Sequence, residues 1–186
     1  MPPNPDLEAL ALLRRRDARG FDQAYAKYGG RLFSFLSRLV GGRQRQLAED
    51  LLQQTFLKLA EHGPELRADS DLRAWLFTVA RHAFLGQLRS SRHEVESPSL
   101  ELIADYSADA EVRLMLGDVE QALGRLRIED RELLLLVGAE GLEPMTVARM
   151  LGVEPATLRK RLARARQRLL QELARAAPNE VTEASS

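Results

Sequence analysis

The sequence predicts an all-α fold of two small helical domains joined by a flexible linker, with a helix-turn-helix in the second domain. Apolar residues recur every three or four positions along most of the 186 residues, as on the buried face of an α-helix. No stretch alternates apolar and polar residues as a half-buried strand would. A run rich in serine and charged residues interrupts the helical spacing between residues 90 and 107. We therefore expect one domain on each side of this run.

Four helices are expected in the first domain. Each ends where glycine, proline or a polar run breaks the apolar spacing. In chain order they cover residues 7–16, 21–40, 47–62 and 71–89.

The segment 91–107 has the composition of a flexible linker. The expected boundaries are 1–90 for the first domain, 91–107 for the linker, 108–175 for the second domain and 176–186 for a frayed tail. The alternative is a single domain in which 91–107 is an ordinary surface loop.

Proline and glycine divide the second domain into short helices. Pro144 suits the first turn of a helix, and Gly152 is expected to close that helix with a positive φ. Pro155 then opens a longer helix. The pattern of short helix, tight turn and longer helix predicts a helix-turn-helix. In chain order the apolar positions of the four expected helices fall within 112–126, 133–137, 144–151 and 155–174.

The composition excludes several classes of protein. The chain has no cysteine, so neither a disulfide framework nor a thiolate metal site is expected. Its longest apolar run, Leu133 to Val137, is far shorter than the roughly 20 residues of a membrane span. The first residues lack the basic flank and apolar core of a secretion signal. We therefore expect a soluble, cytoplasmic protein with no membrane span.

Catalysis is not expected. The three histidines, His62, His82 and His93, do not fall at metal-ligand spacings. The chain has neither a phosphate-binding glycine loop nor the sharp turn that presents a nucleophilic serine. The sequence therefore predicts no enzyme activity, no cofactor and no metal.

The charges are unevenly distributed although the net charge is zero. Residues 1–90 carry +4, residues 91–151 carry −7, residues 152–175 carry +5 and residues 176–186 carry −2. Local fields of this kind steer binding, so a nucleic-acid partner is compatible with the neutral total. The alternative is that the charges only solvate helix faces.

The outward face of the last helix has the composition of a DNA-reading surface. Arginine can donate to guanine edges in the major groove, and any cation on this face can neutralise a phosphate. The alternative is a solvated basic face on a structural helix. The candidate DNA contacts are Thr157, Arg159, Lys160, Arg161, Arg164 and Arg168.

Three motifs, in this order, resemble those of the extracytoplasmic-function (ECF) sigma factors of the sigma-70 superfamily. Ala48-Glu-Asp-Leu-Leu-Gln-Gln-Thr-Phe56 is similar to the family's region 2.2, and Leu72-Arg-Ala-Trp-Leu-Phe-Thr-Val-Ala-Arg81 to regions 2.3 and 2.4. The stretch from Glu140 to Arg166 resembles region four. The resemblance covers about residues 15–90 and 110–173.

The resemblance implies an RNA polymerase sigma factor that directs promoter-specific transcription initiation. Its implied partners are core RNA polymerase (the clamp of the largest subunit and the flap of the second-largest), promoter DNA and an anti-sigma factor. Region four would read the minus-35 element through the basic face of the last helix. The implied minus-10 contacts are Arg73, Arg81, His82 and Arg89, and the implied polymerase contacts are Asp50, Gln53 and Gln54.

The sequence departs from the family pattern at four positions. The family usually has Glu where Gln54 stands, Asn where His82 stands and a polar residue where Gly86 stands. It usually has proline where Arg127 stands, so the turn before the next helix is expected to be less rigid.

Two other functions fit part of the sequence. A conventional helix-turn-helix regulator would explain residues 144–170, but not the polar face around Asp50 or the basic helix around Trp75. An adaptor that only binds polymerase would generate no promoter-specific transcripts.

Overall fold

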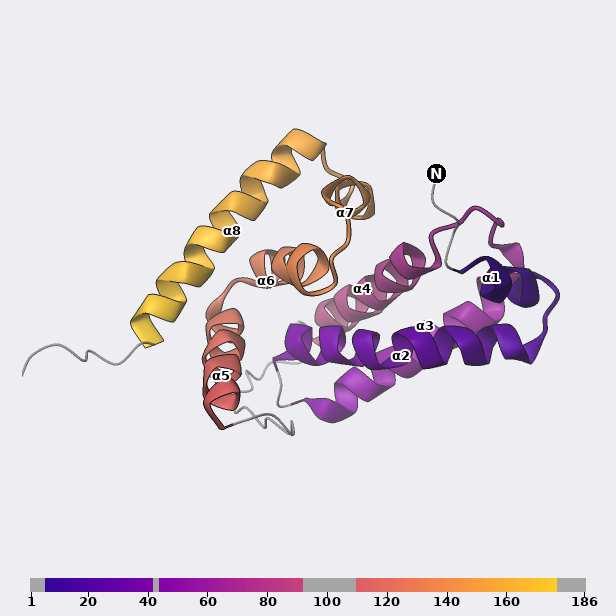
Figure 1. The fold of residues 1–186 in the computed structure, drawn as a ribbon, viewed down its shortest axis with the longest axis horizontal. Helices are drawn as coiled ribbons and strands as arrows, with labels where there is room; N and C mark the ends of the chain where they lie inside the picture. The colour runs from indigo at the N-terminus through magenta and orange to yellow at the C-terminus, as the bar shows by residue number, and fades with distance from the viewer. Residues whose placement is uncertain (1–5, 42–43, 92–109, 177–186) are drawn as a thin grey trace, which may run out of the picture. The chain divides into compact units, whose positions relative to one another are not determined.

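The computed structural model describes residues 6–41, 44–91 and 110–176 (Figure 1). Every regular element in these ranges is helical, which confirms the all-α prediction. The chain divides into two compact units, Met1–Glu101 and Leu102–Ser186. The proposed linker lies almost entirely outside the described residues. None of the described helices is long and apolar enough to cross a bilayer.

The first unit is built around its longest helix, α2, which contacts α1, α3 and α4. The rings of Phe35 on α2 and Phe77 on α4 meet edge to face in the core, with their centroids 5.2 Å apart. Both side chains are fully buried. The helices of this unit are α1 (Leu7–Arg14), α2 (Ala18–Val40), α3 (Arg45–His62) and α4 (Leu72–Ser91), with a short 3₁₀ turn at Gly63–Glu65.

Helix α1 is held against α2 by a buried carboxylate and by a close approach of backbone. Asp6, which is 4% exposed, accepts hydrogen bonds from the Tyr28 hydroxyl at 2.7 and 2.9 Å and from Lys27 Nζ at 2.7 Å. Burial and the hydrogen bond with Asp6 raise the pKa of Tyr28. A Cβ at Gly20 would lie only 2.7 Å from the Leu13 nitrogen, so only glycine allows this crossing.

The turn between α1 and α2 places a non-glycine residue in the left-handed region. Arg16 has a φ of 58°. Its N–H donates to the Leu13 carbonyl at 2.9 Å, and the Asp17 N–H donates to the Leu12 carbonyl at 3.0 Å. This is the Schellman arrangement, which satisfies the last carbonyls of a helix. It ends α1 two residues earlier than the apolar spacing predicts.

The second unit contains the predicted helix-turn-helix. Pro144 lies in the first turn of α7, and Gly152 ends that helix with a φ of 63°, as expected. The Val153 N–H donates to the Ala148 carbonyl at 3.0 Å, completing a second Schellman turn. The helices of this unit are α5 (Ala110–Arg125), α6 (Ile128–Leu134), α7 (Pro144–Leu151) and α8 (Pro155–Ala176).

Helix α6 ends in a wider turn that the sequence did not predict. Leu135–Ala139 form a π-helical turn, in which the Glu140 N–H donates to the Leu135 carbonyl at 2.8 Å, five residues earlier. The expected helical residues 133–137 are therefore shared between α6 and this turn.

A buried arginine closes the junction between α5 and α6. The Arg131 guanidinium donates to the carbonyl oxygens of Leu123 (2.8 Å), Gly124 (2.5 Å) and Leu126 (3.2 Å). The carbonyls of Gly124 and Leu126 have no further turn of α5 to bond with, so the side chain supplies donors to them. The Leu123 carbonyl also accepts from the Leu126 N–H at 3.1 Å. Burial lowers the pKa of Arg131. The junction is thus ordered without the family's proline at position 127.

Replacing Arg16 by glycine is expected to stabilise the first unit by about 1 kcal/mol, because glycine adopts the left-handed conformation without the Cβ clash. The free energy of unfolding in urea measures this effect. The control is Arg15→Gly at the preceding position, where φ is −87° and glycine brings only a loss of stability. Equal effects of the two substitutions would contradict the strain assigned to Arg16.

Arg127→Pro is expected to stabilise the second unit by roughly 0.4–1 kcal/mol. Arg127 already has a φ of −58°, close to the value that proline imposes, and its N–H donates to no backbone carbonyl of the described residues. Arg127→Ala controls for loss of the exposed contact with Glu129. If the proline variant unfolds at a lower urea concentration than the alanine variant, the junction does not accept proline.

Candidate nucleic-acid interface and partner groove

The first half of α8 presents an exposed basic face. Leu158, Leu162 and Ala165 are buried, so the opposite side of the helix faces solvent. Among the described residues, no acidic side chain forms an ion pair with the exposed cations of this half. Their charges are therefore available to a polyanion. The exposed candidates are Thr157, Arg159, Lys160, Arg161 and Arg164.

Arg168 differs from the other candidates because the structure gives it a partner. Its Nη1 donates to Oδ2 of Asp130 on α6, 38 positions earlier in the chain. The Asp130 side chain is 13% exposed and that of Arg168 is 48% exposed. The sequence suggested no such partner, because the two residues lie far apart along the chain.

The four minus-10 candidates on α4 divide into two pairs. His82 and Arg89 are exposed, and their separation of seven residues places them on one face of the helix. Arg73 and Arg81 are half-buried, and each already has an interaction within the chain. Trp75 on the same helix is also only half-buried.

The three polymerase candidates lie together on the exposed surface of α3. Asp50, Gln53 and Gln54 are all exposed, and Asp50 accepts a hydrogen bond from Gln46 Nε2 at 3.2 Å. Gln53 also lines a groove between α2 and α3, and the other two do not.

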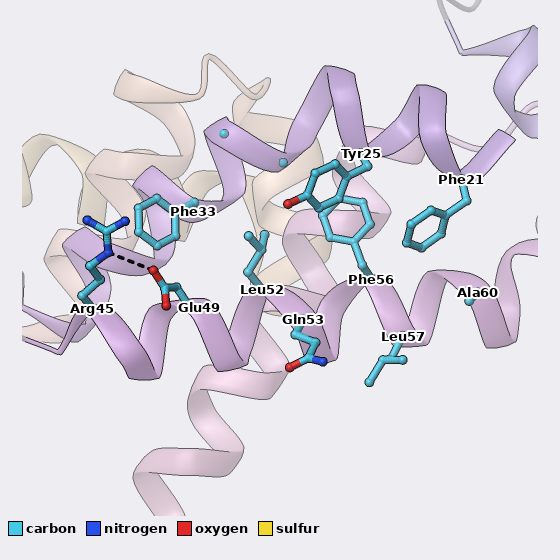
Figure 2. A pocket seen from close by; sticks show the side chains of 12 residues that line it. Phe21, Tyr25, Phe33, Arg45, Glu49, Leu52, Gln53, Phe56, Leu57 and Ala60 are labelled. Carbon is cyan, nitrogen blue, oxygen red and sulfur yellow. Dashed lines mark hydrogen bonds and ion pairs between the residues drawn. The ribbon is translucent and has the colours of Figure 1, made fainter. Parts of the chain in front are cut away.

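The groove is an open, largely apolar hollow of about 660 Å³ (Figure 2). The rings of Tyr25 and Phe56 meet across it, with centroids 4.8 Å apart, and Phe21 packs against Phe56 at 5.6 Å. Tyr25 is 51% exposed and Leu57 is 61% exposed, although both are large and apolar. The groove is lined by Phe21, Tyr25, Gly29, Gly30, Phe33, Arg45, Glu49, Leu52, Gln53, Phe56, Leu57 and Ala60.

Charged groups lie at one end of the groove only. Figure 2 shows Arg45 and Glu49 at this end, joined by an ion pair of 2.8 Å between Arg45 Nε and Glu49 Oε1. The Arg45 guanidinium also lies over the Phe33 ring, 5.8 Å from its centroid. An apolar floor with charged groups at one end suits an amphipathic helix of another protein.

The sequence did not predict the groove, because Phe21 and Tyr25 fit the same apolar spacing as the core residues of α2, and spacing alone does not separate the two. One residue of α3, Leu57, could have indicated the groove from the sequence. Leu57 directly follows Phe56 and falls off the buried stripe, so it is an apolar residue without a place in the core.

Within the described residues, no three metal-ligating side chains gather in one place. The candidate surfaces are the cations on α8, a mixed face on α4 and an apolar groove beside a polar patch on α3.

Two family models match the chain, and together they include these surfaces except for Phe21 at the groove. Sigma-70 region 2 matches residues 24–94, and Sigma-70 region 4 matches residues 116–169.

Curated relatives carry the same regions. The ECF RNA polymerase sigma factor SigM of Mycobacterium tuberculosis is 32% identical over 148 residues, which are 78% of this chain and 73% of SigM. EcfG of Rhodopseudomonas palustris, also an ECF sigma factor, is 34% identical over 112 residues, 59% of this chain and 61% of EcfG.

Solved structures agree in fold. The sigma factor RpoE of Bartonella quintana, in complex with the anti-sigma factor NepR, superposes with a TM-score of 0.72 and 29% identity, covering 83% of this chain and 96% of RpoE. CnrH, in complex with the cytosolic domain of CnrY, superposes with a TM-score of 0.68 at 24% identity, covering 92% of this chain and 99% of CnrH. From its two sigma-70 regions and its similarity to SigM, the chain belongs to the ECF family of RNA polymerase sigma factors, which are transcription initiation factors and not enzymes.

Proposed function

We propose that this chain directs core RNA polymerase to specific promoters, with residues 1–90 binding the polymerase and the minus-10 element, and residues 108–175 binding the minus-35 element. The observation that carries the proposal is the exposed basic face of α8 within a helix-turn-helix, in a chain that also carries a separate sigma region 2.

The minus-35 element is read as duplex DNA by α8. In a helix-turn-helix the second helix enters the major groove with its N-terminal residues toward the bases. Thr157, Arg161 and Arg164 lie on that part of α8, and Arg159 and Lys160 flank them. We assign base reading to Arg161 and Arg164, and phosphate contact to Arg159 and Lys160.

The minus-10 strand is held on α4. Unstacking a base costs a few kcal/mol, which has to be offset by contacts to the base and to its phosphates. The exposed His82 and Arg89 make the contacts to the unstacked base. Arg73 and Arg81 contribute from their half-buried positions.

Core polymerase binds through the polar face of α3 and the groove beside it. Asp50, Gln53 and Gln54 contact the clamp of the largest subunit, and a helix of that clamp covers the exposed apolar surface of Tyr25 and Leu57. Residues 108–175 contact the flap of the second-largest subunit.

The cellular context follows from these partners. Core polymerase and the chromosome are cytoplasmic, so we place the protein in the cytoplasm. The likeness to RpoE, which was crystallised with NepR, supports an anti-sigma factor as a further partner.

Run-off transcription tests the whole proposal. The purified chain is added to sigma-free core polymerase and genomic templates without any inhibitor, and transcripts with defined start sites are expected. Unchanged, non-specific transcription would refute the proposal.

Arg161→Ala and Arg164→Ala are each expected to reduce promoter-specific transcription by about tenfold, because a bidentate arginine–guanine contact is worth about 1–3 kcal/mol. Co-elution with core polymerase on gel filtration should be unchanged. Full transcript levels from both variants would remove these residues from the reading surface.

Leu57→Glu is expected to weaken core binding by about tenfold or more, since it loses the burial of a leucine, about 1.5–3 kcal/mol, and places a charge in the interface. Stability should change little because Leu57 is exposed. The matched control is Leu7→Glu on α1, an exposed leucine outside the groove. Equal affinity of the two leucine variants would exclude the groove from the interface.

Asp50→Ala should also lower core affinity.

A further inference from the structure

The first turn of α6 carries two adjacent charges that point to two different helices. Asp130 accepts from Arg168 on α8, and its neighbour Arg131 donates to three carbonyls at the end of α5. Both residues of α6 are buried. One short helix therefore ties α5 to α8 through directional polar contacts as well as through packing.

The bridge is attached to the stripe of α8 that carries the DNA candidates. Arg168 follows Arg161 by seven residues and Arg164 by four, which returns it to nearly the same side of the helix. Rotation of α8 about its axis would move all three side chains together. A contact made by Arg168 therefore limits the directions in which Arg161 and Arg164 point.

Apolar packing alone gives weaker control over this rotation. The buried positions in the first half of α8 are Leu158, Leu162 and Ala165. Contacts between apolar side chains have no preferred direction. The ion pair differs because its hydrogen bond is directional and one partner, Asp130, is nearly enclosed.

We propose that Asp130 and Arg168 are positioning residues for minus-35 reading. Burial of the apolar stripe turns the arginine face of α8 outward, and the bridge fixes the final rotation of the helix and withholds Arg168 from the DNA. The inference rests on the proposed function of α8. It also reassigns Arg168, which the sequence placed among the DNA contacts.

The test uses holoenzyme assembled from core polymerase and the full chain, on a promoter recovered by run-off transcription. The measured quantity is selectivity, the ratio of affinities for the native promoter and for the same DNA with a substituted minus-35 element. Asp130→Asn, Arg168→Gln and the double variant are compared, with urea unfolding to correct for the folded fraction. The salt dependence of binding is measured for each.

Each single variant is expected to lose selectivity by about tenfold, and the double variant no more than either, because both substitutions remove the same contact. The salt slope of Arg168→Gln should stay at the wild-type value, whereas Arg159→Gln should reduce its magnitude by about 0.9, the effect of one lost phosphate contact. The charge-reversed pair, Asp130→Arg with Arg168→Asp, should recover selectivity.

Two results would overturn the inference. A reduction of the salt slope by about 0.9 in Arg168→Gln, with tighter binding in Asp130→Asn, would make Arg168 a phosphate contact that Asp130 merely competes for. Unchanged selectivity in both single variants would leave the bridge a stabilising contact only. If Arg161→Ala also keeps full selectivity, the failure lies in the proposed function of α8 instead.

Discussion

Burial of one apolar stripe on each helix is the constraint on which the rest of this protein depends. Helices of eight to twenty-three residues, such as α1 and α2, gain most of their stability from packing on their neighbours. A stripe of three or four residues in every two turns leaves the remaining surface to solvent. On α8, burial of Leu158, Leu162 and Ala165 is what turns the arginines outward. The basic face is thus a consequence of the core.

The charges of the molecule fall into two physical groups. Buried ones, such as Asp6 and Arg131, join segments of the chain and have several hydrogen bonds each, as the cost of desolvation requires. The exposed cations in the first half of α8 have no such partners among the described residues, so their charge is available for binding. Arg168 is half exposed, but like the first group it joins two segments of the chain, through its bond to the nearly enclosed Asp130.

The groove in the first unit leaves apolar side chains exposed instead of burying them. Exposure of Tyr25 and Leu57 costs free energy in the isolated chain, because apolar surface is left in water. If a partner covers the groove as proposed, that cost would be recovered, and the same side chains that weaken the free protein would strengthen its complex. The polar patch around Gln53 lies at the edge of this surface, where it can orient an incoming helix.

The sequence by itself determined the helical class, the helix-turn-helix with Pro144 and Gly152 at its ends, and the basic composition of α8. These features follow from rules that act over a few residues: apolar spacing, the φ of proline and the left-handed freedom of glycine. Only the tertiary structure revealed the groove, because residues about thirty positions apart on α2 and α3 form it, and the bridge from Arg168 to Asp130, whose partners are 38 positions apart. Spacing along a chain specifies which face of a helix is buried, but the packing of the helices decides which side chains meet.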